Sequence, residues 1–239
     1  RSMGRGRHRP GGPRDGGRMT RPLAQALVLD FGGVISKTLF ETHDLTERAL
    51  GLAPCTLKWL GPFAPDSDPL WTSMQRGEIS ERDYWLTRSR EGGRMVGEDW
   101  HDMETFVKRA RGADPETVIR PEAARAINLA ADAGLRLAIL SNELDLFYGA
   151  DFRTRLSILE RFDAIVDATH TGILKPDPRA YQTVLDELAL EADNCVFVDD
   201  QRRNIAGAAA CNMRTVLFDV RNPAASYSEA LRHFGLQFE

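Results

Sequence analysis

The chain has 239 residues, enough to bury the core of one large domain or of a core domain with an inserted segment. Its composition, 42% hydrophobic and 28% charged, is ordinary for a globular protein, and no apolar run approaches the ~20 residues that span a bilayer. Residues 1–21 hold seven arginines and one acid, so the remaining chain carries −4 − 6 = −10, which argues against nucleic acid as a partner.

The N-terminal residues 1–21 form an Arg/Gly-rich tail with almost nothing to bury, and we expect this tail to be disordered. It lacks the apolar segment of a secretory signal. The cysteines are odd in number and lack the spacing of a metal site or a disulfide framework; they are Cys55, Cys195 and Cys211. We therefore expect a cytoplasmic protein without a membrane partner.

Folding is expected to begin with the stretch LVLDFGGVI, residues 27–35. Its short apolar run is typical of a buried parallel strand, and the two glycines after Asp30 indicate a sharp bend that lets backbone approach a ligand. Open α/β sheets bind ligands at the carboxyl ends of their strands. Taken alone, however, an acid at the end of a strand is equally well explained as the cap of a turn.

Residues 38–114 have a different sequence pattern, with few runs of β-branched residues and many charged residues at helical spacing. Ser80 followed by Asp83 indicates the start of a helix, and the apolar spacing over 103–110 predicts another. We predict a mainly helical insert of about 75 residues directly after the first strand. Its aromatic residues are candidate substrate contacts, although aromatics on helices are more often core: Trp59, Trp71, Tyr84 and Trp85.

Strands and helices alternate after Pro121. Strands are predicted over 135–140, 164–166, 195–198 and 215–218. Helices are predicted over 122–133, 143–160, 177–188, 204–211 and 223–234. Alternation of this kind indicates a doubly wound parallel sheet. The predicted fold is therefore α/β, with a Rossmann-like sheet of five parallel strands and an inserted helical segment.

Polar residues gather where these strands and loops end. Right-handed crossovers place the carboxyl ends of all strands at one edge of the sheet, so residues 170 positions apart can meet. They are Asp30, Ser141 with Asn142, Lys175, and Asp199 with Asp200. Carboxylates, a lysine and hydroxyl and amide groups suit phosphoryl transfer with a hard cation. Each feature alone is a common turn or cap; all four in this order are not.

The motifs LVLDFGGVI, LAILSN, GILKPDP and VFVDDQRRNIAGA resemble, in order, the four motifs of the haloacid dehalogenase-like (HAD) superfamily. The resemblance covers residues 23–220. It implies a HAD-like α/β core over 22–37 and 115–239. It also implies that residues 38–114 are a helical cap domain, which closes over the active site.

The resemblance also implies a role for each site residue. Asp30 would be the nucleophile that forms an aspartyl-phosphate, with Lys175 bridging it to the phosphate. Mg²⁺ would be the cofactor, held by Asp30, Asp200 and the backbone carbonyl of Gly32. The remaining residues would bind the phosphate or support the site: Ser141, Asn142 and Gly33 at the phosphate, and Asp199 and Asn204 as supporting groups.

Gly32 departs from the family's phosphatase pattern, which usually has a second Asp two residues after the nucleophile. That Asp protonates the leaving group and later activates water. A general acid contributes about 10²–10⁴-fold, and Gly32 has no side chain to supply it. Relatives with a DxGxV first motif, including sugar-phosphate phosphatases, share this gap.

Three functions remain open. The first is a Mg²⁺-dependent phosphatase of a small phosphorylated metabolite, with a sugar phosphate as one possibility. The second is a 2-haloacid dehalogenase, which also lacks the second Asp but generally has a serine-rich fourth motif instead of Asp199-Asp200. The third is a HAD-fold binding or regulatory protein. We expect the phosphatase, as a monomer or homodimer.

Overall fold

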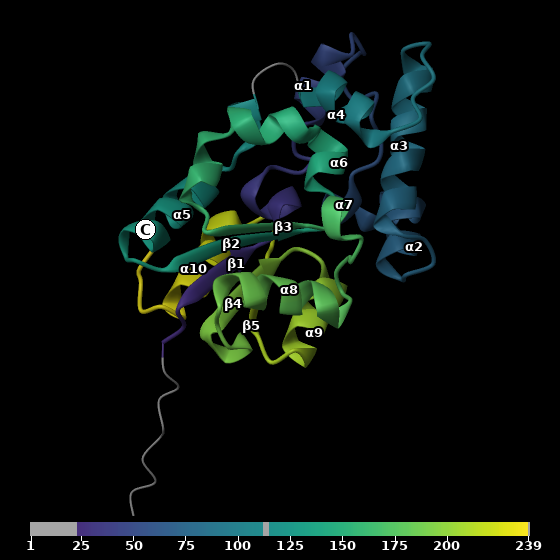
Figure 1. Ribbon diagram of the computed structural model, residues 1–239. Coiled ribbons are helices and arrows are strands. Elements are labelled where there is room, and N and C mark those ends of the chain that lie inside the picture. The colour runs from purple at the N-terminus through teal and green to yellow at the C-terminus, as the bar shows by residue number, and fades with distance from the viewer. Residues whose placement is uncertain (1–22, 112–114, 239) are drawn as a thin grey trace, which may run out of the picture.

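A sheet of five parallel strands forms the centre of the computed structural model, which describes residues 23–111 and 115–238 (Figure 1). The predicted disordered tail lies outside these residues. The strands are β1 (Ala26–Leu29), β2 (Arg136–Ser141), β3 (Ala164–Asp167), β4 (Cys195–Asp199) and β5 (Arg214–Leu217). Every predicted strand is present, shifted by at most one or two residues at its ends. The predicted α/β fold with a five-stranded parallel sheet is confirmed.

The strand order β3-β2-β1-β4-β5 places β1 in the middle. The chain runs outward from β1 through β2 to β3, and then returns to add β4 and β5 on the other side. Leu29 therefore lies between Ile139 of β2 and Val198 of β4. The reversal of direction at β1 and β4 is the switch point at which doubly wound sheets bind ligands.

Two layers of helices cover the sheet. Helices α8 (Pro178–Leu188) and α9 (Arg202–Ala210) pack on one face, and α5 (Pro121–Asp132) and α10 (Pro223–Arg232) pack on the other (Figure 1). The side chains of β1 alternate accordingly: Ala26 and Val28 join the apolar cluster under α8, while Leu27 and Leu29 join the cluster under α5 and α10. Both faces of β1 are therefore buried, as its continuous apolar run predicted.

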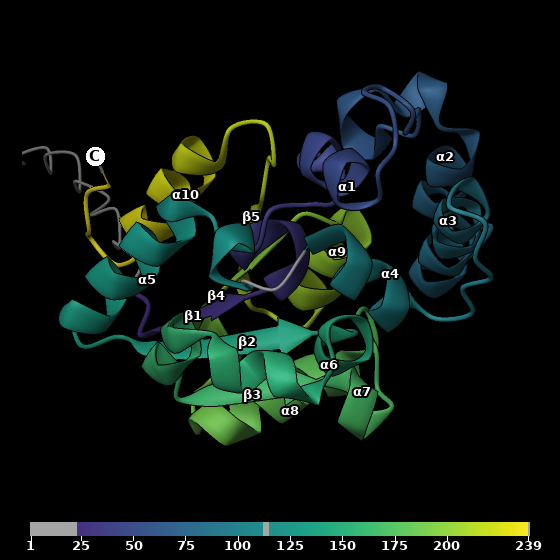
Figure 2. The ribbon, with the colours of Figure 1, turned by 90° about the horizontal axis from the view of Figure 1, so that it is seen from above.

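The predicted helical insert forms four helices between β1 and α5: α1 (His43–Ala49), α2 (Pro69–Gln75), α3 (Glu81–Met95) and α4 (Met103–Arg111). Figure 2 shows them grouped beyond α6, on the side toward which the arrow of β2 points. Helix α3 begins with the predicted capping box, in which Ser80 and Asp83 bond each other's backbone N–H. The insert's buried aromatic side chains, its four tryptophans among them, belong to the same apolar cluster as Leu27 and Leu29.

The single helix predicted over 143–160 is wrong. The segment forms a short helix α6 (Leu144–Tyr148), followed by two 3₁₀ turns over Ala150–Arg155 and Ser157–Arg161. Gly149 ends α6 with φ 81°, a conformation that side chains other than glycine rarely adopt. A further short helix that was not predicted, α7 (Ala168–Thr171), directly follows β3.

Within the described ranges, every helix is too short or too polar to cross a bilayer.

Candidate active site

The ends of β1 and β4 bring two acids together with one lysine. Asp30 follows β1 and donates its backbone N–H to the carbonyl of Val198 at 2.9 Å, so it lies beside Asp199 at the end of β4. The Lys175 Nζ donates to Asp30 Oδ1 and to Asp199 Oδ2, at 2.8 Å each. Lys175 is only 4% exposed and Asp199 is fully buried. These three side chains therefore meet at the switch point of the sheet.

Asn142 holds the loop that carries Lys175. Its Oδ1 accepts the backbone N–H of Lys175 at 2.7 Å, and its Nδ2 donates to the Lys175 carbonyl at 3.3 Å. Both ends of the amide are therefore occupied in positioning the lysine. Ser141, the neighbouring residue, differs: among the described residues its hydroxyl has no hydrogen-bond partner, although the residue is only 6% exposed.

Asp199 is saturated by its surroundings. Besides Lys175, it accepts hydrogen bonds from the Gln201 backbone N–H at 2.7 Å and from Asn204 Nδ2, at 3.1 Å to one oxygen and 3.0 Å to the other. The other amide atom of Asn204, Oδ1, is buried without a partner in the described part of the chain. Asp199 therefore anchors Lys175, and its supporting role in a reaction stays a prediction.

Asp200 stands in contrast to Asp199. No described residue donates a hydrogen bond to its carboxylate, which is placed against the backbone of Gly33. A Cβ at position 33 would lie 2.7 Å from Asp200 Oδ2, so this close approach requires glycine, which also has φ 79° here. Carboxylate oxygens of Asp30, Asp199 and Asp200 all lie within 4.8 Å of one another.

The charges in this cluster do not balance. With every acid ionised, three carboxylates and one lysine sum to −3 + 1 = −2, and Asp30, Asp199 and Lys175 are buried while Asp200 is half-buried. Burial, opposed by Lys175 and reinforced by Asp199, raises the pKa of Asp30 to about 7. Burial together with Asp199 and Asp30 raises the pKa of Asp200 well above its usual range. Burial alone would lower the pKa of Lys175, but Asp199 and Asp30 raise it above its ordinary value.

The donor set of this cluster fits a divalent cation of the magnesium type. It offers carboxylate oxygens, which hard cations prefer, and one carboxylate, that of Asp200, is otherwise uncompensated. A charge of +2 matches the excess of −2. A bound cation would also reverse the raised pKa of both acids, because it favours their ionised form.

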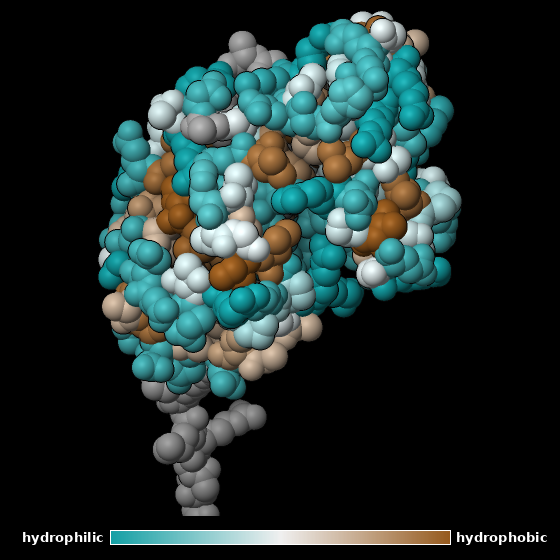
Figure 3. Space-filling model, turned by 45° about the vertical axis from the view of Figure 1, so that its right-hand side comes forward, coloured by the Kyte–Doolittle hydropathy of each residue, from teal (hydrophilic) through white to brown (hydrophobic). Residues whose placement is uncertain are grey.

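A cavity lies directly above the cluster, between the strand ends and the inserted helices. Its polar floor includes Asp30, Gly33, Ser141, Lys175 and Asp200. Its other wall is apolar and is built by both the insert and α6, with Leu39, Phe40, Trp71, Trp85, Val107, Leu144, Phe147 and Tyr148. Figure 3 shows several separate apolar patches, in brown, divided by hydrophilic surface on this face of the molecule.

The four aromatic residues singled out in the insert divide into two pairs. Trp71 and Trp85 line the cavity, as candidate substrate contacts should. Trp59 and Tyr84 do not; they pack inside the insert, where the Trp59 ring contacts Trp85 and the Tyr84 hydroxyl donates to Asp68 at 2.8 Å. For that pair, core packing, the alternative that the sequence left open, describes what the structure shows.

Gly32 is not required by the backbone. Its φ of −70° and ψ of 122° suit any residue, and a Cβ built there meets no atom within 4 Å. The next carbonyl, that of Gly33, accepts a hydrogen bond at 3.0 Å from the buried guanidinium of Arg120, which fixes the loop. A side chain at position 32 would therefore enter open space at the site without disturbing the fold.

Two further acids line the cavity that the sequence reasoning missed. Glu81, the first residue of α3, is 3.2 Å from the Arg203 guanidinium, and Glu143, two residues after Ser141, is 2.6 Å from the Arg82 guanidinium. Both ion pairs join the insert to the core. In the sequence, Glu81 directly follows the predicted helix cap Ser80, and Glu143 lies two residues after the predicted site residue Ser141. Neither neighbourhood indicates that the acid lies over the site.

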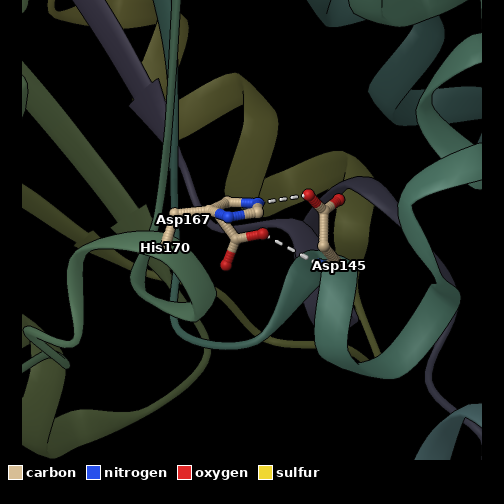
Figure 4. A group of neighbouring side chains, drawn as sticks. All are labelled: Asp145, Asp167 and His170. Atoms are coloured by element: carbon tan, nitrogen blue, oxygen red, sulfur yellow. Dashed lines mark hydrogen bonds and ion pairs between the residues drawn. The ribbon is translucent and has the colours of Figure 1, made fainter.

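A second acidic group lies at α6 and α7, outside the cavity. Figure 4 shows the Asp145 and His170 side chains in contact, at 2.6 Å, with Asp167 beside them. Arg153 pairs with both acids, at 2.6 Å to Asp145 and 2.9 Å to Asp167. Asp167 also accepts the backbone N–H groups of residues 144 and 145. These carboxylates are satisfied by protein groups and fix the start of α6, so we assign no cation to them.

Known proteins match this chain in sequence and in fold. The family model described as haloacid dehalogenase-like hydrolase matches residues 7–212. Protein CbbY, encoded on a plasmid of Cupriavidus necator, is 32% identical over 209 residues, which cover 81% of this chain and 77% of that protein. The (S)-2-haloacid dehalogenase 1 of Pseudomonas sp. strain CBS-3 is 31% identical over 161 residues, 67% of this chain and 70% of the relative.

Among solved structures, the putative HAD-hydrolase YfnB from Bacillus subtilis, bound to magnesium, is similar with a TM-score of 0.63 at 15% identity. The match covers 82% of this chain and 87% of that one. A doubly wound sheet with a buried acid–lysine–acid cluster at its switch point defines an α/β enzyme. The chain belongs to the haloacid dehalogenase-like hydrolase family, and it is a hydrolase.

Proposed function

We propose that this hydrolase is a Mg²⁺-dependent phosphatase, which cleaves a small phosphorylated metabolite through an aspartyl-phosphate on Asp30. The observation that carries the proposal is the uncompensated charge of −2 on Asp30, Asp199, Asp200 and Lys175. Asp30 and Asp200 would hold the cation, with the Gly32 carbonyl as a further oxygen ligand. When bound, Mg²⁺ would neutralise negative charge on the acids and on the phosphoryl oxygens.

The residues of the chain would divide the chemistry as follows. Asp30 Oδ2 attacks phosphorus, while Oδ1 stays bonded to Lys175 at 2.8 Å. Lys175 and the unpartnered Ser141 hydroxyl stabilise the phosphoryl oxygens during transfer, with Gly33 keeping the backbone close to them. Asn142 keeps Lys175 in place, and Asp199, itself held by Asn204, anchors the Lys175 ammonium group. Water then hydrolyses the aspartyl-phosphate and restores Asp30.

Within this function, residues 38–114 would serve as the cap and residues 22–37 and 115–239 as the catalytic core. Three contacts from the insert reach the core near the strand ends: Glu81 to Arg203 in the first turn of α9, Arg82 to Glu143, and Gln75 to Gln201 at 2.9 Å. A closed cap excludes water from the transferring group. The apolar wall of the cavity supports a leaving group that presents an apolar face, in addition to the sugar phosphates that the sequence resemblance favours.

A 2-haloacid dehalogenase is the second candidate, because Asp30 and Lys175 would serve equally well when the attacked atom is carbon. The relative from Pseudomonas carries that name. Such a reaction does not need a cation, and it gives no role to the unpaired Asp200 beside Asp30. Phosphate release from a panel of aryl, alkyl and sugar phosphates, with Mg²⁺ and with chelator, separates the two. Halide release from 2-haloacids that persists in chelator would favour the dehalogenase.

Metal binding has an expected dependence on pH. The pKa of Asp30 is about 7 in the folded metal-free protein but ordinary in the unfolded chain. The folded state therefore holds a proton that the unfolded state has lost, and metal-free stability falls as pH rises from about 4 to about 7. Mg²⁺ must displace this proton, so it should bind more tightly as pH rises through about 7.

Asp200→Asn tests this account. The substitution removes a half-buried, unpaired carboxylate that lies beside two other acids, so we expect the metal-free unfolding midpoint at pH ~8 to rise by a few degrees. Excess Mg²⁺ should raise the midpoint of the wild type but not that of Asp200→Asn. Thermal unfolding with Mg²⁺ and with chelator measures both effects. Equal stabilisation of the two proteins by Mg²⁺ would place the cation elsewhere.

A further inference from the structure

We propose that Glu81, contributed by the inserted segment, is a catalytic residue that protonates the departing leaving group and then activates the hydrolytic water. This inference rests on the proposed phosphatase function. It assigns the general acid and base of the reaction to a side chain that reaches the site from α3, opposite the strand ends that carry Asp30 and Lys175.

The chemistry requires such a group. An oxygen that leaves phosphorus with its electron pair is a strong base unless a proton reaches it, and general acids contribute about 10²–10⁴-fold to such steps. The acids of the strand ends are already engaged: Asp30 attacks, Asp199 is saturated by hydrogen bonds, and Asp200 would hold the cation. Gly32 has no side chain, and the space beside it is open.

Glu81 has the position and the free atom that this task needs. It is the first residue of α3 and lies inside the capping box that Ser80 forms with Asp83, so the start of the helix fixes its backbone. It lines the cavity together with Asp30, Lys175 and Asp200. Its Oε2 contacts Arg203 at 3.2 Å, whereas Oε1 accepts no hydrogen bond from any described residue. One carboxyl oxygen is therefore available to a ligand.

The charges around Glu81 suit a proton donor that works near neutral pH. Arg203 faces it from α9, and Lys175, Asp199, Asp30 and Asp200 face it from the strand ends and loops. Glu143, paired with Arg82, faces it from the end of β2. Burial raises the pKa of the Glu81 carboxyl above its ordinary value, and Arg203 and Lys175 only partly oppose that rise.

Glu143 is the rival for this role. Burial raises its pKa to about 7, and its Oε2 is buried without a partner among the described residues. The charges that act on it most strongly, however, are those of Arg82, Glu81 and Asp167. Those that act on Glu81 include Lys175 and Asp199, and Glu81 in turn acts on Asp30 and Asp200. Both acids line the cavity, and Glu81 is the one whose carboxyl is influenced by the charges of Lys175 and Asp199.

The two steps balance in protons and electrons. As Asp30 forms its bond to phosphorus, the bond from phosphorus to the leaving oxygen breaks, and that oxygen takes the proton of the Glu81 carboxyl. Glu81, now a carboxylate, accepts a proton from water while the water oxygen attacks phosphorus. The bond from phosphorus to Asp30 breaks with its electron pair on Asp30. Inorganic phosphate departs, and Glu81 is again a carboxylic acid.

The test compares Glu81→Gln with the wild type on two substrates, 4-nitrophenyl phosphate and a simple alkyl phosphate. Single-turnover release of the leaving group isolates the first step. We expect release of the alkyl leaving group to fall about 10²–10⁴-fold and release of nitrophenolate, which needs no proton, to change far less. The basic limb of the pH profile for the alkyl substrate should also disappear. Adding Gly32→Asp to Glu81→Gln should restore part of the alkyl rate.

Glu143→Gln is the matched control, and it should change both substrates by a similar factor. Equal loss on both substrates in Glu81→Gln, or a loss confined to the alkyl substrate in Glu143→Gln, would overturn the assignment. Failure of the proposed phosphatase function would look different from failure of the Glu81 assignment. In that case the wild type would release no phosphate, or Asp30→Asn would release it as fast as the wild type. Unfolding midpoints of both glutamine variants show whether the fold is retained.

Discussion

Asp30→Asn is expected to lower the rate of phosphate release on the order of 10⁴-fold or more, with every substrate that the wild type cleaves. An amide oxygen does not attack phosphorus, and neither Asp199 nor Asp200 is placed to take over, since Asp199 is held by Lys175 and Asn204. Steady-state release of phosphate with Mg²⁺ present measures the effect.

The fold of Asp30→Asn should be retained, because the amide oxygen can still accept the Lys175 hydrogen bond. Removal of a buried acid whose pKa is about 7 should also leave the metal-free variant at least as stable as the wild type at pH ~8. Asp186→Asn makes the same change on the exposed face of α8 and should leave the rate unaltered. A well-folded Asp30→Asn protein that keeps wild-type activity would rule out Asp30 as the nucleophile.

Lys175→Met is expected to cost about 3–5 kcal/mol of folding stability near pH 8, as well as activity. Lys175 is 4% exposed and is bonded to two acids that are themselves buried, so its loss leaves Asp30 and Asp199 without their shared cation. Part of the loss should be recovered at lower pH, where the acids can be protonated. Urea unfolding at pH ~6 and ~8 measures both quantities.

Lys108→Met is the matched control for this result. Lys108 is bonded to Glu104 at 2.6 Å, as closely as Lys175 is to its partners, but the pair lies on the exposed surface of α4. Solvent screens such a pair, so its removal should change stability little. If both methionine variants lost the same stability, burial of the Lys175 cluster would not be the source of the effect.

The meeting of Asp30, Lys175 and Asp199 could be predicted from sequence, because it depends on a general rule. Each residue closes a strand or a loop on one edge of a parallel sheet, and right-handed crossovers bring those ends together. Apolar patterns and helix-end signals predicted the strands and the helices α5, α8, α9 and α10 to within a few residues. Asp177, which caps α8, shows the local part of this success, since cap and proline together specify where a helix starts.

The contribution of the insert could not be predicted in this way. The placement of Glu81 over the site depends on how α3 packs against the core, which involves contacts such as Arg203 and Glu81, 122 positions apart. The error over 143–160 has a similar origin. Asp167, more than 20 residues away, bonds the first N–H groups of α6, and Gly149 then ends the helix. The pattern of apolar and charged residues within a segment does not show either of these long-range contacts.

The central claim is that Asp30 itself carries the phosphoryl group during turnover. A rapid acid quench of wild-type protein in excess over a radiolabelled phosphate ester, with Mg²⁺ present, tests it most directly. We predict that label appears on the peptide containing Asp30 within the first turnover and then decays into inorganic phosphate, and that Asp30→Asn never acquires it. Label that passes from substrate into inorganic phosphate without appearing on the protein at any time would contradict the claim.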